Sequence, residues 1–588
     1  MRSRLGQGDK TARPAHPRGS WVARGRAALE SLREWHPSNR VVIGACVLAA
    51  AGLLAGLLAW SFASPYGTTP DEDYHMISAW CPHPGQGGCQ IVGETQDGQP
   101  IIAAPGKFGS RSCFVDKPMS SVACKEEVKG GIVETPRVNT GTYAGYYYNI
   151  MHVFASEDVD RLTVSVRVTN SLIAALLALS VLLFMNAAAR RIYVWTVAIT
   201  AVAGMAWLVG SAAPDSWSIV GVTTVWASIT GVFLATVRWR RNGLLATAVI
   251  GALLASSARA DAGVYVMIAA AAPCIINWRA LRDSHALRRM WYLPATVVAI
   301  FVIGAVGFVS ARQASGMITG GCGVWCAPTP NPQGALHLFV SNVVYFFDWI
   351  TNSWRGTWDV GQPQFPALIL FAAGALVVGA ALSRGGMTKA KALALALAAG
   401  VFIGAPILSL QLGHSLLALG QGGLQQRYVF PALIILVGVA LTPTANGVRR
   451  YLSPRFTVAL WAVVVIAQAV FLHQWIRRCV TGLAIQGFNL TPGAQWWWAS
   501  GPGPMAVWVI GTLGFAVASA AVVFVWWQPR SEDAIDELTP ASAEPATEAE
   551  PGARRDRAEE ITGLSPGEPD LSRPGPSLPV GVAESSAG

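Results

Sequence analysis

Charge is scarce in this chain of 588 residues: Asp, Glu, Lys and Arg make up 13% of it, whereas 52% of its residues are hydrophobic. No soluble globular domain is needed to account for residues 160–528. The sequence also lacks a Walker motif and a glycine-rich nucleotide-binding loop, so we do not expect ATP-driven work. Its nine cysteines are not accompanied by paired histidines or zinc-ribbon spacings, which disfavours a zinc site.

Apolar runs of about 20 residues recur along the chain, and each is long enough to cross a hydrocarbon layer roughly 30 Å thick as a helix. Because backbone polar groups must be satisfied internally in lipid, these runs predict an all-α polytopic membrane protein. We expect twelve spans, near residues 41–63, 163–187, 192–213, 217–237, 243–258, 262–277, 290–311, 364–383, 389–409, 428–444, 456–475 and 505–527.

Basic residues gather in alternate loops. They occur in the first 40 residues, which hold nine Arg or Lys, and again at 190–191, 238–241, 279–289, 384–391 and 449–455. By the positive-inside rule, this pattern places both termini in the cytoplasm. The net charge of +10 therefore reflects topology, and we do not expect a nucleic-acid partner.

The chain divides into a basic cytoplasmic tail (1–40), a transmembrane domain (41–528) and a second cytoplasmic tail (529–588). The last segment is rich in Pro, Glu, Ser and Ala, and we predict that it is disordered. Two outer loops are large, 64–161 and 312–363. The first apolar run lacks a clear small-x-small cleavage site, which favours a signal anchor over a cleaved signal peptide.

The first outer loop is expected to contain local structure of its own. A short helix is predicted to begin at Pro70. Two strand-like segments, residues 90–92 and 101–102, flank an Asp97-Gly98 turn signal and predict a hairpin.

Six cysteines are expected in the outer loops: Cys81, Cys89, Cys113, Cys124, Cys322 and Cys326. An even set in an oxidising compartment predicts disulfides. The four cysteines of the first loop allow three connectivities, and the sequence does not choose between them. Cys322 and Cys326 could close a small ring.

Carboxylates and an imidazole cluster directly after the first apolar run, in Thr69-Pro70-Asp71-Glu72-Asp73-Tyr74-His75. Ionisable groups close to hydrocarbon are costly and tend to mark function. A structural alternative is a capping box, in which Thr69 is the N-cap and Glu72 is the third helical residue. Capping does not require Asp71 and His75, which on a helix would share one face and could bind a common ligand.

Three places in the chain carry a resemblance to a known family. They are Pro70-Asp71-Glu72 with His75, the tyrosines Tyr146-Tyr147-Tyr148, and Gln426-Arg427-Tyr428-Val429-Phe430-Pro431. With a first membrane helix before an outer loop, they resemble the membrane glycosyltransferases of the GT-C superfamily. Among these, the chain looks most like the bacterial domain-of-unknown-function family 2142.

The resemblance implies a polyprenyl-phosphate-linked sugar donor, an inverting displacement, and an envelope glycan or lipid acceptor outside the bacterial plasma membrane. Catalysis would rest on Asp71, Glu72 and His75, with Asp71 as base, Glu72 mainly capping the helix and His75 assisting. Partial desolvation at the bilayer edge could raise the pKa of such a carboxylate. No cofactor is implied with certainty, and a divalent metal at the Asp71 cluster is an alternative that is not favoured.

Arginines and tyrosines are the expected substrate-binding residues. Arg427 or Arg259 could bind the lipid phosphate through the guanidinium fork. The alternative for each is interfacial snorkelling or a structural ion pair, for example between Arg259 and Asp261. Tyr147 and Tyr148 could stack on sugars or belong to the interfacial aromatic belt, and Tyr428 is part of the matched motif.

Two other functions stay open. Twelve helices with both ends inside is also a common plan for secondary transporters, although these usually place ionisable residues near the midplane in corresponding halves. A non-catalytic partner in envelope assembly could retain the same fold, because fold does not guarantee activity.

Overall fold

The computed structural model describes residues 39–109, 114, 117–124, 131–200, 205–283, 288, 290–311, 335–352, 364–384, 386–411, 426–443, 454–498 and 501–521. The chain divides into two units, 1–538 and 539–588, and every described residue belongs to the first. The predicted tail 529–588 and nearly all of the tail 1–40 therefore lie outside the described residues.

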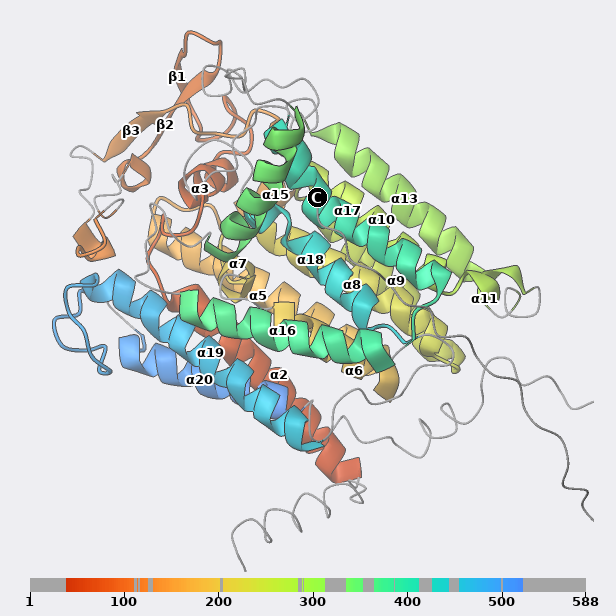
Figure 1. Cartoon of the computed structure of the whole chain (residues 1–588). Helices are drawn as coiled ribbons and strands as arrows, with labels where there is room; N and C mark the ends of the chain where they lie inside the picture. The colour runs from red at the N-terminus through yellow and green to blue at the C-terminus, as the bar shows by residue number, and fades with distance from the viewer. Residues whose placement is uncertain are drawn as a thin grey trace, which may run out of the picture. The chain divides into compact units, whose positions relative to one another are not determined.

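Helices dominate the described residues (Figure 1). The first half contains α2 (Asn39–Phe62), α3 (Glu72–Trp80), α4 (Tyr146–Met151), α5 (Val159–Phe184), α6 (Ala187–Thr200), α7 (Met205–Val209), α8 (Asp215–Leu234), α9 (Arg238–Ser256), α10 (Ala260–Ile276) and α11 (Trp278–Arg282). The second half contains α13 (Tyr292–Ser310), α15 (Ala335–Asn352), α16 (Gln364–Arg384), α17 (Lys389–Gln411), α18 (Phe430–Leu441), α19 (Pro454–Thr481) and α20 (Pro504–Ala520). Short 3₁₀ helices are η1 (Gly106–Gly109), η2 (Val122–Cys124), η3 (His152–Phe154) and η5 (Gln426–Tyr428).

Each of the twelve predicted spans coincides with helical structure in the described part of the chain. The third, 192–213, is divided between α6 and α7, with residues 201–204 outside the described residues. The fifth and sixth are separate helices, since α9 ends at Ser256 and α10 begins at Ala260.

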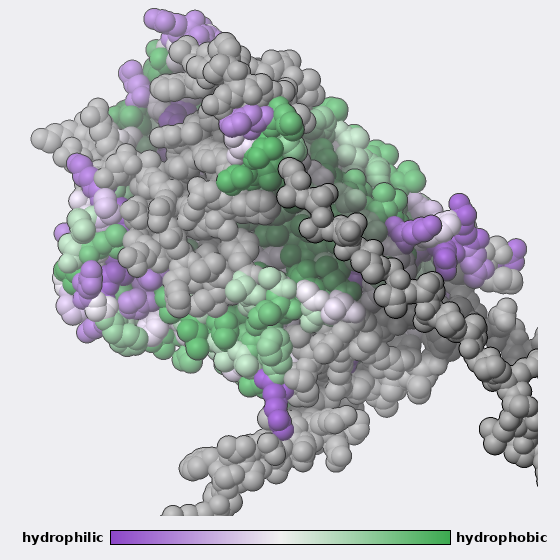
Figure 2. Space-filling view, viewed as in Figure 1, coloured by the Kyte–Doolittle hydropathy of each residue, from purple (hydrophilic) through white to green (hydrophobic). Residues whose placement is uncertain are grey.

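Six helices among the described residues are long and apolar enough to cross a membrane: Ile43–Phe62, Val159–Phe184, Asp215–Leu234, Tyr292–Ser310, Lys389–Ile407 and Arg455–Thr481. The crossing of the other six predicted spans stays a prediction. Figure 2 shows hydrophobic residues along α13 and hydrophilic residues around α11. The exposed side of α13 includes Val298, Val302 and Val306, as expected for a helix that faces lipid.

Small residues let neighbouring helices approach closely. A Cβ at Gly251 of α9 would lie 2.9 Å from the carbonyl oxygen of Gly221 in α8. A Cβ at Gly304 of α13 would lie 2.6 Å from the carbonyl oxygen of Gly263 in α10. Backbone contact of this kind is the usual basis of helix association in membranes, where apolar side chains gain little by leaving lipid.

A small antiparallel sheet lies between α3 and α4 in the sequence. Strand β1 (Ile91–Glu94) pairs with β2 (Pro100–Pro105), as the Asp97-Gly98 turn predicts, and β2 also pairs with β3 (Ile132–Thr135). The third strand is absent from the sequence-based prediction. In Figure 1 the sheet lies beside α3, near one end of the long helices.

The disulfide prediction is confirmed for one pair. Cys81 and Cys89 are bonded and join the end of α3 to the start of β1. The side chains of Cys113, Cys124, Cys322 and Cys326 lie outside the described residues, so their pairing stays a prediction.

Reporter fusions test the predicted orientation. Gly98 lies in the β1–β2 turn, and Gly386 lies between α16 and α17. Alkaline phosphatase fused after Gly98 should be active, whereas at Gly386 only a cytoplasmic reporter such as green fluorescent protein should be active. If both positions report the same side, the twelve-span topology is wrong.

Candidate functional site

The first and last of the three motif segments meet in space. The guanidinium of Arg427, just before α18, donates from Nη1 to the carbonyl oxygen of Pro70 at 3.0 Å, and from Nη2 to the carboxylate of Asp71. The Arg427 side chain is only 2% exposed, whereas that of Asp71 is 35% exposed. A buried cation therefore holds a carboxylate that solvent or a ligand can reach.

Asp71 has an unusual backbone conformation. Its φ of 54° and ψ of 18° lie in the left-handed region, and it is the only non-glycine residue with positive φ among the described residues. Asp tolerates this conformation better than most residues, but it still carries strain. With this backbone conformation, the Asp71 carboxylate points to Arg427. Asp71 is not helical, so α3 begins at Glu72 and not at Pro70.

The capping box is only half formed. The carboxylate of Glu72 accepts from the backbone N–H of Thr69 at 3.5 Å, as the motif requires. The Thr69 hydroxyl is buried without a hydrogen-bond partner, so it does not cap the helix, and this part of the prediction is wrong.

Glu72 is instead the partner of Arg167 in α5. Two bonds of 2.8 Å join the guanidinium to the two carboxylate oxygens, and the side chains are 1% and 0% exposed. Arg167 also donates to the carbonyl oxygens of Ser61, Ser64 and Pro65. This pair ties the chain between α2 and α3 to α5, so the geometry assigns Glu72 a positioning role.

His75 faces the tyrosines and not the Asp71 side chain. Its Nδ1 lies 2.9 Å from the hydroxyl of Tyr148, while its Nε2 is buried without a hydrogen-bond partner. Toward Asp71, its backbone N–H donates to the carbonyl oxygen at 2.9 Å. Burial lowers the pKa of His75 to about 4, because the opposing effects of Asp71 and Asp215 are smaller. The imidazole is therefore neutral at pH 7.

Folding stability should decrease as the pH falls from about 6.5 to about 4. In this range His75 binds a proton in the unfolded state, whereas the buried imidazole of the folded state stays neutral. Thermal unfolding in detergent, measured across this range, should show a weaker pH dependence in His75→Gln than in the wild type. His83→Gln, at an exposed histidine of the same loop, is the control. Identical pH profiles for His75→Gln and the wild type would contradict a buried neutral imidazole.

A second ionic group adjoins Arg427. Arg259, between α9 and α10, forms two bonds to Asp261, of 2.9 and 3.1 Å, and one of 3.1 Å to Asp215 at the start of α8. The other oxygen of Asp215 lies 3.4 Å from Nη1 of Arg427. The predicted Arg259–Asp261 pair is confirmed. Asp215 was missed, although an acid at the start of an apolar helix is a recognisable signal.

Aromatic rings cover the two arginines. The Arg259 guanidinium carbon lies 4.0 Å from the ring centre of Tyr428 and 5.6 Å from that of Tyr143. The Tyr428 hydroxyl accepts from Arg427 at 3.1 Å. Both rings are only partly buried, so they remain within reach of a ligand.

Tyr147 and Tyr148 are packed inside the protein. Tyr147 accepts from Asn170 at 3.2 Å and contacts the Trp217 ring edge-on, and Tyr148 pairs with His75. They are 0% and 1% exposed, so neither offers a ring face to a sugar in this conformation.

Electrostatics at Asp71 differ from the sequence-based expectation. Burial by itself raises the pKa of the Asp71 carboxyl, but the charge and hydrogen bond of Arg427, with a smaller effect of Arg137, hold that pKa below its usual range. The expected upward shift is therefore wrong for this conformation. In this conformation, Asp71 is an ion-paired carboxylate.

The donor set does not suit a divalent metal. Each carboxylate of the motif has its own arginine: Asp71 with Arg427, Glu72 with Arg167, and Asp73 with Arg137 at 2.7 Å. Among the described residues, no three His, Cys, Asp or Glu side chains are grouped closely enough to hold a metal ion. The two buried arginines of the cluster, Arg259 and Arg427, are already paired with carboxylates. An anionic ligand would therefore have to replace one of these carboxylates as the arginine's partner.

The segments that form this site lie within a region that matches a known protein family. A family model described as "predicted membrane protein (DUF2142)" matches residues 54–437. The chain belongs to this family. The match runs from within α2 to within α18 and includes Asp71, Asp215, Arg259 and Arg427. No curated protein and no solved structure matches the chain.

Proposed function

We propose that this DUF2142 protein is a membrane glycosyltransferase of the GT-C type. It moves a sugar from a polyprenyl-phosphate donor to an envelope glycan or lipid on the outer face of the bacterial plasma membrane. The observation that carries the proposal is the meeting of Asp71, Arg427 and Arg259, which lie far apart in the sequence, at the starts of α3, α18 and α10. Asp215, at the start of α8, connects the two arginines. A carboxylate base and a phosphate-binding arginine are the two groups that the reaction needs.

The resting ion pair supports an exchange mechanism. The donor phosphate competes with Asp71 for Arg427, whose planar fork suits a phosphate as well as a carboxylate. Once Arg427 binds the phosphate, it no longer lowers the pKa of Asp71, and the nearby anion raises it. Donor binding thereby turns an ion-paired carboxylate into an available base.

The chemical step follows from these positions. The acceptor hydroxyl oxygen attacks the anomeric carbon, and its proton passes to the Asp71 carboxylate. The bond between the anomeric carbon and the phosphate oxygen breaks, and the lipid phosphate leaves with the electron pair. Arg427, with Arg259 behind it, stabilises the charge on the leaving phosphate.

The location of the cluster favours this function over transport. Asp71 and Arg259 directly precede α3 and α10, and Asp215 is the first residue of α8, so all three lie at helix ends. A transporter is expected to place such groups on interrupted helices near the bilayer midplane.

Donor binding by Arg427 variants tests the proposal. Arg427→Lys should weaken binding of a labelled polyprenyl-phosphate sugar in part, because a point charge replaces the fork, and Arg427→Gln should weaken it by roughly tenfold or more. Binding to detergent-purified protein can be followed by scintillation proximity. Arg478→Gln is the matched control, since Arg478 is also buried but donates to the carbonyl oxygens of Phe114 and Ser120.

The loss of donor affinity in each variant shows whether Arg427 binds the donor. Near-normal donor binding in both Arg427 variants, with thermal melts that show folded protein, would reduce Arg427 to a structural arginine. An equal loss in Arg478→Gln would assign the effect to general destabilisation.

A further inference from the structure

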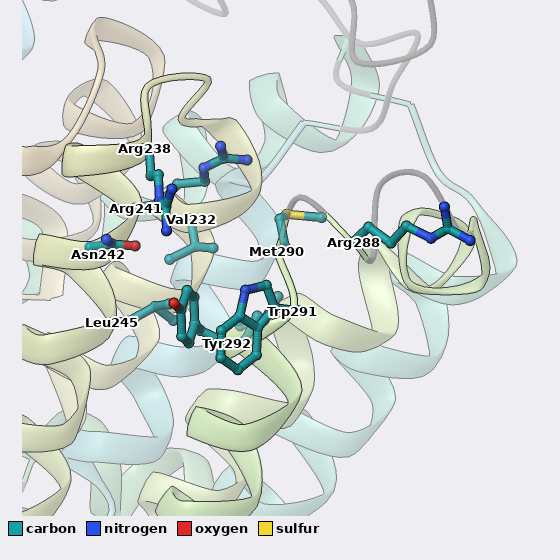
Figure 3. A pocket seen from close by; sticks show the side chains of 10 residues that line it. Val232, Arg238, Arg241, Asn242, Leu245, Arg288, Met290, Trp291 and Tyr292 are labelled. Carbon is teal, nitrogen blue, oxygen red and sulfur yellow. The ribbon is translucent and has the colours of Figure 1, made fainter.

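A cavity of about 270 Å³ lies at the other end of α8, away from the carboxylate cluster (Figure 3). Val232, one of its lining residues, follows Asp215 by 17 positions in α8, which corresponds to roughly 25 Å along the helix axis. The charge pattern predicts that this end faces the cytoplasm. The cavity is lined by Val232, Arg238, Arg241, Asn242, Leu245, Arg288, Met290, Trp291, Tyr292 and Leu293.

The charged side chains that line the cavity are all positive among the described residues. Its described lining includes Arg238, Arg241 and Arg288 and contains neither Asp nor Glu. Arg238 and Arg241 lie in the first turn of α9, which holds no acidic residue. Figure 3 shows these two arginines next to each other on one side of the cavity.

The rest of the lining is apolar and aromatic. Val232, Leu245 and Leu293 are buried in its wall. Trp291 and Tyr292 are 56% and 38% exposed at the start of α13, as is typical of side chains at a membrane interface.

Beyond the cavity, α9 and α13 pack against each other and present apolar side chains outward. These include Ile250 and Leu253 on α9 and Val298 and Val302 on α13. An anion that binds here therefore lies at the ends of two helices that expose apolar side chains farther along. Such side chains suit an acyl chain and serve no purpose for a free phosphate ion.

We propose that this cavity binds the phosphate head group of an anionic phospholipid, whose acyl chains lie along α9 and α13. Basic pockets between membrane helices are suited to such head groups, because the arginine forks bind phosphate oxygens while the chains stay in the hydrocarbon. Nothing in this assignment depends on the proposed transferase reaction.

Native mass spectrometry of the full-length protein in detergent tests the proposal. A titration with dioleoyl phosphatidylglycerol should show one lipid that is retained in preference to dioleoyl phosphatidylcholine. In Arg238→Gln/Arg241→Gln, the dissociation constant for phosphatidylglycerol should rise roughly tenfold or more. Arg279→Gln/Arg282→Gln removes two exposed arginines of α11 that do not line the cavity, and should bind as the wild type does.

A second variant separates binding from folding. Asn242→Trp keeps all three arginines but fills the cavity from an exposed position in the first turn of α9, and it should also lose the retained lipid. Retained binding in this variant would overturn the proposal.

Three further results would also overturn it. They are equal binding of phosphatidylcholine, an equal loss in the α11 control, and full displacement of the lipid by millimolar sodium phosphate. The last result would mean that the cavity selects a free anion.

Discussion

Glu72→Gln is expected to lower the free energy of unfolding by about 3–5 kcal/mol, the typical cost of breaking a buried ion pair from one side. The substitution leaves the Arg167 guanidinium charged and buried, without the carboxylate that now receives two of its hydrogen bonds. The amide of Gln can accept one bond but cannot neutralise the charge. The effect can be measured by denaturant or thermal unfolding in a fixed detergent.

Asp73→Asn provides the control from the same motif. Asp73 pairs with Arg137, and these side chains are 42% and 50% exposed, so solvent screens the pair. Its loss should change stability by less than about 1 kcal/mol. The double variant Glu72→Gln/Arg167→Gln should cost less than the sum of its single variants, because the charge that is left unpaired is also removed. If Glu72→Gln is no worse than Asp73→Asn, Glu72 is a simple helix cap.

Asp71→Asn is expected to lower turnover by roughly 10²–10⁴-fold, the usual contribution of a general base. The two side chains are nearly isosteric, and the amide can still accept a hydrogen bond from Arg427. Donor affinity should be kept or should increase, since the carboxylate that competes with the phosphate for Arg427 is gone. The measurement needs purified protein, a donor that supports turnover, and thermal melts that show equal folding.

The Asp73→Asn variant tests whether Asp71 or its neighbour is the base. Asp73→Asn should retain activity, because Asp73 points to Arg137. If Asp73→Asn loses turnover while Asp71→Asn keeps it, the base is misassigned within the right cluster. If both variants stay fully active, the cluster is structural.

The order of the helical segments along the chain could be predicted from the sequence, because the signal for each helix lies within its own residues. Apolar runs of sufficient length and the alternation of basic loops depend on residues that are neighbours in the chain. The β1–β2 hairpin has an equally local signal in Asp97-Gly98. Strand β3 has no such local signal, because it pairs with a strand about thirty residues earlier in the chain and no short turn connects the two.

The partners in the candidate site could be predicted only in part. Arg259 and Asp261 are two positions apart, and their ion pair was anticipated from the sequence. The partners of Asp71 and Glu72, in contrast, come from residues 356 and 95 positions away. A pKa depends on such neighbours, so the direction of the shift at Asp71 could not be read from the motif.

The sequence by itself determined a mostly helical chain of the DUF2142 family, the segments that carry its charged motif, and the cysteines that could pair across the first outer loop. These features follow from composition, spacing and short motifs. Only the tertiary structure decided that Arg427 holds Asp71, that Arg167 holds Glu72, and that Tyr147 and Tyr148 are buried. The physical reason is that a buried charge needs an opposite charge or hydrogen-bond acceptors wherever the fold provides them, and helix packing, not sequence distance, sets which residues meet.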